Sequence, residues 1–386
     1  MGVGENKLRS GLAIAAAFGL IALLAACGRP PEVPPGLSLI QTTFSALPGW
    51  DRDRMAEALP ALLKSCAAIA KMPVDKSIGP NGIAGTPADW QEACSTAALV
   101  PGNDNAAMAK FMSDYFRPFA ALDRSGRGGL FTGYYEADLQ GSLTPTANFP
   151  APLYLAPAQP VAFTRAEIDG GALAGRGLEF LWLHDAVDVF LLQVQGSGRI
   201  RLTDGRVVRV GYAGNNGQKF VAIGKAMIHD GLIQSGSVSM QSIRDWLKTH
   251  PAEAMAWMQK NPRYIFFEMV KGDGPLGAQG VALTAGRSLA VDPDFLPLGA
   301  PIWLDTAWPA DNNAAKAGDP LQRLMLAQDV GNAIKGPVRG DMFWGSGDAA
   351  LYFAGHMKNP GRYFLLLPKP VAERNSLTVT DILSQQ

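Results

Sequence analysis

This 386-residue sequence has few of the residues that mark metal or thiol chemistry. It contains 3 cysteines and 4 histidines, and His184, His229, His250 and His356 show no spacing typical of metal ligands. No Gly-Lys-Ser/Thr phosphate-binding loop occurs in the chain. We therefore expect neither a bound metal nor a cofactor.

The chain also lacks an excess of charge and a long apolar run. Its 34 basic side chains equal its 34 acidic ones, so the formal net charge is 0. A near-neutral chain has no basic surface for nucleic acid. The apolar run at 12–24 is shorter than the ~20 residues that span a bilayer. Nucleic acid is therefore not expected as a partner, and a membrane-spanning anchor is disfavoured.

That apolar run has the flanks of a secretory signal. Lys7 and Arg9 precede it, and the small residues Ala25 and Ala26 follow it. A charged start, a short apolar core and a small-residue cleavage site are typical of a signal peptide. We predict a signal peptide over residues 1–26.

Cys27 directly follows the small residues, as in a bacterial lipobox. We predict that this cysteine carries diacylglycerol. Gly28 rather than Asp follows it, so the outer membrane is expected, with the protein facing the periplasm. Residues 27–44 are rich in proline and predict a stiff tether between the lipid and the folded protein.

Cys66 and Cys94 remain as an even pair in an exported protein. A disulfide is the favoured interpretation, because oxidising compartments preserve such bonds. The alternative is two separate buried thiols. Neither cysteine has a neighbouring His or Asn that would indicate a catalytic thiol.

Apolar spacing predicts two helices within the first 116 residues, three more between residues 219 and 259, and mostly short strands in the rest of the chain. The predicted helices are 51–71, 105–116, 219–231, 240–249 and 252–259. The predicted strands are 130–137, 190–195, 199–202, 206–212, 265–269, 281–284, 302–304, 324–327, 341–344 and 362–367, with only edge strands in the proline-rich stretch 150–163. Short strands without βαβ alternation favour barrels over a doubly wound sheet. The length of the chain predicts two domains.

Two carboxylates near the C-terminus stand out. Asp329 and Asp341 each lie beside a predicted strand in a segment flanked by glycine. A carboxylate among apolar residues is costly unless it is hydrogen-bonded or protonated. A single Asp of this kind often only ties down a turn, but two close together indicate a site.

These residues carry a resemblance. The segment around Asp329 and Asp341 resembles the 3D domain of the MltA-type membrane-bound lytic murein transglycosylases, with Asp292 as the first of the three aspartates. Three further segments resemble other blocks of that family in the same order, FTGYYE (131–136), LQVQGSGR (192–199) and NPRYIFF (261–267). The sequence differs from the family pattern at Asn332, where glycine is usual.

The resemblance implies a fold class, mainly β with helices. It implies a double-psi β-barrel domain formed by residues 45–141 and 281–370, and a small β-barrel domain inserted at 142–280. A groove between the two domains would hold a glycan strand. Residues 371–386 would form a tail.

The resemblance also implies an activity on peptidoglycan glycan strands. The enzyme would cleave the bond from MurNAc to GlcNAc, and the C6 hydroxyl of the same sugar would close a 1,6-anhydro ring. Asp341 would be the single general acid/base and Asp329 its support, while Asp292 orders a loop. Two alternatives stay open. One is a two-carboxylate hydrolase using Asp341 with Asp329 or Glu136, and the other is a wall-binding lipoprotein without catalysis.

Sugar-binding proteins use aromatic rings, amides and hydroxyls. The expected substrate-binding residues of these types are Tyr134, Tyr135, Glu136, Gln195, Ser197, Arg199 and Tyr212. The alternation at 192–195 predicts that both glutamines share one face of a strand. Lys335 is expected to meet either Asp329 or a substrate carboxylate. Expected partners are peptidoglycan, the outer-membrane lipid and cell-wall synthesis or division proteins.

Overall fold

The computed structural model describes residue 1 and residues 35–234, 240–272, 274–309, 318–331 and 333–374. Cys27, the predicted signal peptide and the first part of the predicted tether lie outside these ranges, as does Asn332. Within them, no helix has the length and apolarity needed to cross a membrane.

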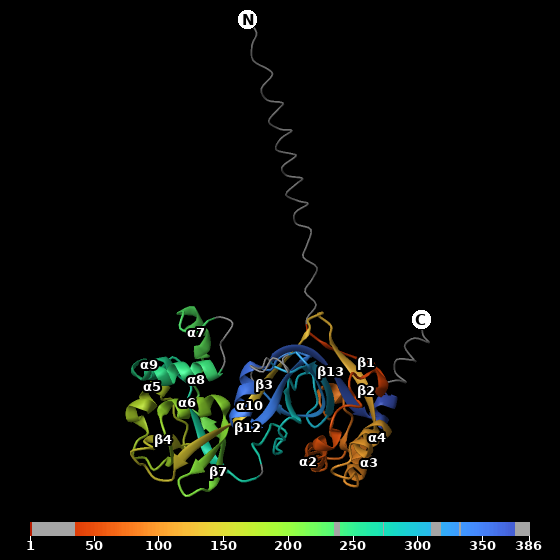
Figure 1. Cartoon of the computed structure of the whole chain (residues 1–386), viewed down its shortest axis with the longest axis horizontal. Coiled ribbons are helices and arrows are strands. Elements are labelled where there is room, and N and C mark those ends of the chain that lie inside the picture. The colour runs from red at the N-terminus through yellow and green to blue at the C-terminus, as the bar shows by residue number, and fades with distance from the viewer. Residues whose placement is uncertain (2–34, 235–239, 273, 310–317, 332, 375–386) are drawn as a thin grey trace.

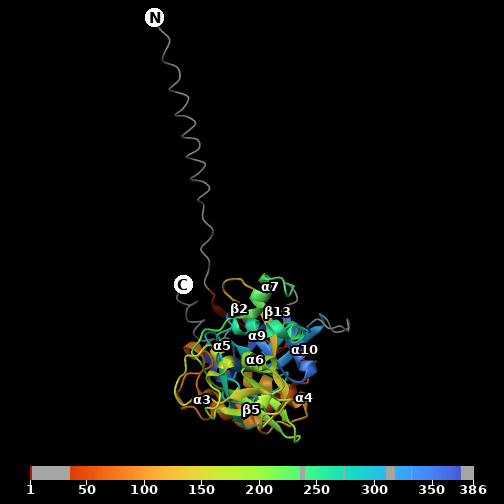
Figure 2. The same cartoon turned by 90° about the vertical axis from the view of Figure 1, so that its left-hand side faces the viewer.

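Two bodies lie side by side in Figure 1, and Figure 2 views the smaller one from its outer side. The first body is formed by the elements at both ends of the described chain. They are β1 (Leu37–Gln41), η1 (Phe44–Ala46), η2 (Met55–Ala58), α2 (Leu59–Ile69), η3 (Pro80–Gly82), α3 (Pro87–Ala97), α4 (Asn105–Tyr115), β2 (Phe116–Asp123), β9 (Ser288–Val291), β10 (Pro301–Ala307), β11 (Pro320–Val330), β12 (Arg339–Ser346), α10 (Asp348–His356) and β13 (Lys358–Pro368).

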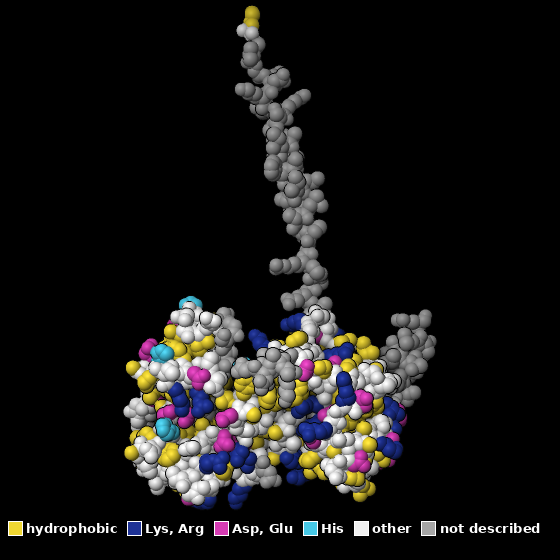
Figure 3. All heavy atoms as spheres, in the orientation of Figure 1, with side chains coloured by type: hydrophobic (Ala, Val, Ile, Leu, Met, Phe, Trp, Pro, Cys, Tyr) yellow, Lys and Arg dark blue, Asp and Glu magenta, His cyan; other side chains and the backbone are white. Residues whose placement is uncertain are grey.

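The second body is formed by the middle of the chain. Its elements are β4 (Ala151–Tyr154), α5 (Arg165–Glu167), η4 (Ile168–Ala172), β5 (Glu179–Leu183), α6 (Ala186–Gln195), β6 (Ser197–Leu202), β7 (Val207–Asn215), α7 (Ile223–His229), α8 (Met240–Thr249), α9 (Pro251–Gln259) and β8 (Ile265–Val270). Side chains of both charge signs are scattered over both bodies on the face shown in Figure 3, in keeping with the zero net charge.

One long strand, β3 (Gly129–Ser142), joins the two bodies. Its first half pairs in parallel with β12 and antiparallel with β13. Its second half pairs in parallel with β6, and its last residues pair with β5. A single strand therefore runs from the sheet of the first body into the sheet of the second, and the first body is discontinuous in sequence.

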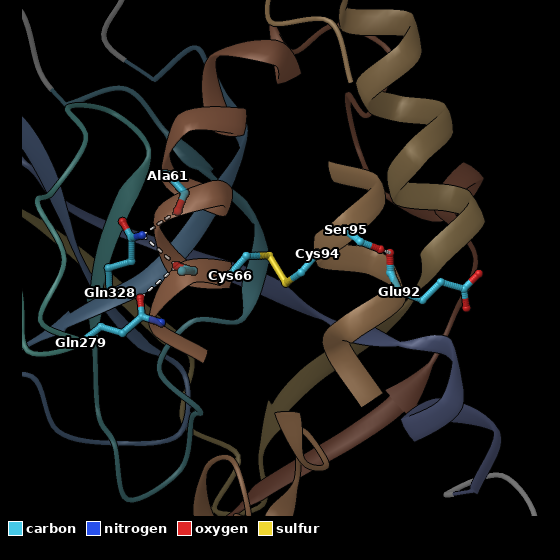
Figure 4. The surroundings of a disulfide bond; sticks show 8 residues. Ala61, Cys66, Glu92, Cys94, Ser95, Gln279 and Gln328 are labelled. Atoms are coloured by element: carbon cyan, nitrogen blue, oxygen red, sulfur yellow. Dashed lines mark hydrogen bonds between the residues drawn. A yellow bond between two sulfur atoms is a disulfide. The ribbon is translucent and has the colours of Figure 1, made fainter. Parts of the chain in front are cut away.

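The core of the first body packs α2, α3 and α4 against the strands. Trp90 and Trp303 are among its largest fully buried side chains. Cys66 of α2 and Cys94 of α3 are joined by a disulfide, which links the two helices. Figure 4 shows the opposite side of α2, where buried Gln328 of β11 donates hydrogen bonds to Ala61 O and Ser65 Oγ, each at 2.8 Å. The helices are thus fixed to the strand that carries Asp329.

The segment 190–195, predicted as a strand, is instead part of helix α6. The Asp185 side chain caps its N-terminus by accepting from the Asp188 N–H at 2.8 Å, and Gly196 ends it in the left-handed conformation at φ 81°. The apolar run is compatible with a buried strand as well as with a helix. The caps at its two ends favour the helix. Gln193 and Gln195 therefore do not share a strand face. Gln193 is buried and accepts from Arg165 Nη2 at 2.5 Å.

Other differences lie in short elements. The segment 281–284 holds only an isolated bridge at Ala282. Strand β1 lies within the range predicted as tether and pairs with β2. Val371 and Ala372, at the start of the predicted tail, are buried in the first core. The predicted fold class, a sheet-rich chain with helices, is confirmed.

Candidate active site

The first half of β3 supplies one wall of the site. Alternate residues of a strand point to the same face, and Thr132, Tyr134 and Glu136 each find a charged partner. Thr132 Oγ1 donates to Asp341 Oδ1 at 2.5 Å, and the Tyr134 hydroxyl donates to Asp329 Oδ2 at 2.8 Å. The third partner is Arg209, whose Nε donates to Glu136 Oε1 at 3.1 Å.

The two carboxylates reach this wall from strands on either side of β9. Asp329 of β11 and Asp341 of β12 are both register partners of Ala290. A bulge between Ala327 and Asp329 shifts the register of β11 at this point. The structure therefore brings the two predicted carboxylates to one level of the sheet.

Asp341 is a half-buried carboxyl group whose pKa is raised above the ordinary aspartate value. Burial is the largest cause, and the charge of Asp329 adds to it. The Thr132 hydrogen bond and the positive charge of Arg339 act in the opposite direction. A raised pKa suits a group that must hold a proton before it donates it.

Asp329 is held more firmly. Besides the Tyr134 hydroxyl, its Oδ1 accepts from the backbone N–H groups of Ala278 at 3.0 Å and Val330 at 2.9 Å. Burial nevertheless raises its pKa. Burial and the neighbouring Asp329 charge hold the pKa of Tyr134 well above its ordinary value, so the phenol stays neutral and donates. Asp329 thus ties down its own backbone and also faces Asp341.

Asp292 and Lys335 form a separate cluster. Asp292 is 2% exposed and accepts from Lys335 Nζ at 3.1 Å and from the Gly336 N–H at 2.8 Å. Lys335 therefore meets a carboxylate, but it is Asp292 rather than the expected Asp329. This arrangement fixes the loop after β11, which is the loop-ordering role expected of Asp292.

Glu136 and Arg199 lie where the two bodies meet. Glu136 is 3% exposed and paired with Arg209, so its carboxylate is already engaged. Arg199 Nη1 of β6 donates to Ser346 Oγ of β12 at 2.8 Å, which links the bodies directly. Its Nε is buried without a hydrogen-bond partner among the described residues.

The remaining predicted binding residues are spread over the second body and the far face of β3. Tyr135 alternates away from Thr132 and Tyr134, and it lines a cavity of about 230 Å³ between the bodies with residues of α6 and α10. Ser197 begins β6 opposite Gly211, and Gln195 ends α6. Tyr212 is 51% exposed, and its hydroxyl accepts from Asn215 at 2.5 Å.

Three residues of the site were not predicted. Thr132 lies within the FTGYYE segment, where its alternation with Tyr134 was a usable signal. Arg339, two residues before Asp341, donates from Nη2 to Thr132 Oγ1 at 2.8 Å. Gly133 admits the Trp344 ring, because a Cβ there would lie 2.5 Å from Trp344 Nε1.

The two half-buried carboxyl groups lie on the strands that flank β9, beside the second body. Paired carboxyl groups are typical of enzymes that cleave glycans by acid/base chemistry. Within the described ranges no cluster of three or more His, Cys, Asp or Glu residues could hold a metal ion.

Comparisons with known proteins identify the family. Residues 160–268 match the MltA specific insert domain, and residues 287–367 match the 3D domain. The chain is 35% identical over 277 residues to membrane-bound lytic murein transglycosylase A of Escherichia coli (strain K12), which covers 71% of this chain and 74% of that protein. The chain belongs to the MltA family.

Solved structures agree with this assignment. The lytic transglycosylase LtgG of Burkholderia pseudomallei is 40% identical with a TM-score of 0.63, and the match covers 87% of this chain and 98% of that one. The structure of E. coli MltA with bound chitohexaose is 27% identical with a TM-score of 0.66, covering 87% and 95%.

Proposed function

We propose that this protein is a lytic murein transglycosylase that binds peptidoglycan glycan strands and cleaves the β-1,4 bond from MurNAc to GlcNAc. The observation that carries the proposal is the Asp341 carboxyl group, half-buried with a raised pKa beside Asp329 in a chain of the MltA family. The chitohexaose held by the E. coli relative supports a glycan as ligand.

The reaction has two proton transfers, and Asp341 carries out both. The protonated acid first gives its proton to the glycosidic oxygen, and the bond from that oxygen to C1 of MurNAc breaks. Positive charge develops on the sugar, and the ionised carboxylate of the nearby Asp329 stabilises this charge. The C6 hydroxyl of the same sugar then attacks C1 and returns a proton to Asp341, so no water is consumed.

The contacts of the other carboxylates favour this single-acid scheme over a two-carboxylate hydrolase. Glu136 is engaged by Arg209 at 3.1 Å. Asp329 accepts three hydrogen bonds, from Tyr134, Ala278 and Val330. A carboxylate so occupied is poorly placed to activate water or to attack the sugar.

The test is digestion of purified sacculi followed by mass analysis of the soluble fragments. The transglycosylase product carries a 1,6-anhydro ring and is lighter by one water than the hydrolase product. Hydrated products would support the hydrolase, and binding to sacculi without release of fragments would support a wall-binding lipoprotein.

We further propose that diacylglycerol on Cys27 anchors the protein to the outer membrane, facing the periplasm. The lipobox supports this location, as does the name of the E. coli relative, which is membrane-bound. Cys27→Ala should leave an unlipidated, full-length precursor. Cleaved protein of the Cys27→Ala variant in the outer-membrane fraction would contradict the anchor.

A further inference from the structure

Arg339 of β12 reaches across to β3 and is fixed there by three acceptors. Its Nη2 donates to Thr132 Oγ1 at 2.8 Å. Its Nη1 donates to the backbone oxygens of Leu130 at 3.2 Å and of Gly340. A planar guanidinium held by acceptors on two strands has one orientation. The strand pairing therefore fixes the position of Nη2, the atom that donates to Thr132.

The Thr132 hydroxyl lies between this guanidinium and Asp341. A hydroxyl has one proton to donate and two lone pairs that accept. Arg339 fills one lone pair, and in this arrangement the proton of Thr132 is donated to Asp341 Oδ1, at 2.5 Å. Oδ1 is then an acceptor, which leaves Oδ2 as the oxygen that carries the acid proton.

We infer that Arg339 is a positioning residue, which acts through the Thr132 hydroxyl to keep the transferable proton of Asp341 on Oδ2. The inference rests on the proposed function and adds to it a specific proton position. Without Arg339 the hydroxyl can turn and accept from Asp341, and the acid proton then points at Thr132 instead of at the glycan.

The charge of Arg339 has a second effect, which gives an independent measurement. It lowers the pKa of Asp341, against the burial and the Asp329 charge that raise it. Tyr134 of β3 stays neutral. The groups that shift the pKa of Asp341 are Thr132, Arg339 and Asp329, and Lys358 of β13 and Asp348 and His356 of α10 are not among them. Loss of the Arg339 charge should therefore raise the pKa of Asp341.

The experiment compares Arg339→Met, Thr132→Val and the double variant of the full-length protein in detergent. The rate of fragment release from sacculi is measured across pH. Each single change should lower the rate about tenfold on the acidic plateau, where Asp341 is protonated. Arg339→Met should cost nothing further in the Thr132→Val background, because its action passes through the hydroxyl.

The pH profile and the conservative variants separate positioning from general damage. The alkaline limb of kcat/KM should move to higher pH in Arg339→Met. Arg339→Lys keeps the charge and one donor, so the limb should stay in place, and Thr132→Ser should recover most of the rate. Thermal melting of each variant shows whether it is folded.

Arg127→Met is the matched control, because Arg127 lines the same cavity of about 490 Å³ as Arg339. Arg127 Nε lies 3.7 Å from Asp123 Oδ2. Its replacement should leave the rate and the pH profile unchanged. Additive rate losses in the double variant, or an unmoved alkaline limb in Arg339→Met, would overturn the inference alone. A folded wild-type protein that releases no fragments would overturn the proposed function, and this inference with it.

Discussion

Asp341 and Asp292 are both aspartates of the first body, but their surroundings differ in kind. Asp292 holds the Lys335 ammonium at 3.1 Å and the Gly336 N–H at 2.8 Å. The hydrogen bond to Asp341 comes from a neutral hydroxyl, that of Thr132, and burial raises its pKa. The comparison indicates how one residue type is divided between two roles. An aspartate in contact with a cation fixes a loop, and one kept from such contact is free to exchange a proton.

The largest expected effect is the loss of turnover in Asp341→Asn. Asn keeps the shape of the side chain and the acceptor for Thr132, but it cannot transfer a proton. General acid/base help is typically worth ~10²–10⁴-fold, and one group serving both steps places the loss at the upper end. Fragment release from sacculi measures it, and pull-down with sacculi checks that binding persists. Near-normal turnover would remove Asp341 from the mechanism.

The next effect is on stability. Asp292→Asn should lower the free energy of unfolding by ~1–3 kcal/mol, because the partly buried Gly336 N–H loses a charged acceptor. Denaturant unfolding of the two asparagine variants side by side gives the contrast. If Asp292→Asn were as stable as the wild type but inactive, the division of roles drawn above would be wrong.

Asp329 lies between these extremes, since it both ties down backbone and faces Asp341. Asp329→Asn should lower turnover about tenfold, the effect of one nearby charge or charge-assisted hydrogen bond. The control is Tyr134→Phe, which removes one donor to Asp329 and keeps its charge. A dead Asp329→Asn protein with an active Asp341→Asn protein would reverse the two roles.

The smallest effect is the pH dependence of stability. The pKa of Asp341 is raised in the folded state, so the protonated carboxyl group stabilises the fold. This contribution to the free energy of unfolding is fully present below the ordinary aspartate pKa. That contribution is lost as pH rises through the raised value. Asp341→Asn should therefore melt at a higher temperature than the wild type at neutral pH, with the gap closing in acid. An equal gap at every pH would speak against a buried titrating carboxyl.

The sequence was sufficient for the parts of the site that are local. Asp329 and Asp341 were found because each interrupts an apolar segment near glycine. Tyr134 was found because it lies in the FTGYYE segment. Thr132 and Arg339 were missed because their role depends on the parallel pairing of β3 with β12, over a separation of 209 residues between Thr132 and Asp341. No local pattern encodes such a pairing.

The error at α6 has a different cause. Its apolar run fits a buried strand as well as a helix, and periodicity alone could not decide between them. The deciding signals were at its ends, in the Asp185 cap and in Gly196. Helix α3 was missed although Thr86 and Asp89 form a capping box at its start. In both cases the caps carried more information than the run between them.

The continuity of β3 restricts how the length of this chain can vary. Thr132, Tyr134 and Glu136 face the two carboxylates and Arg209 by strict alternation, and the same strand continues into the second body. Inserting or deleting one residue there would turn Thr132 and Tyr134 to the opposite face. Two such changes would restore the alternation but displace one body along the other by a full repeat of the strand. Length changes in descendants of this sequence should therefore accumulate in the loops and leave β3 untouched.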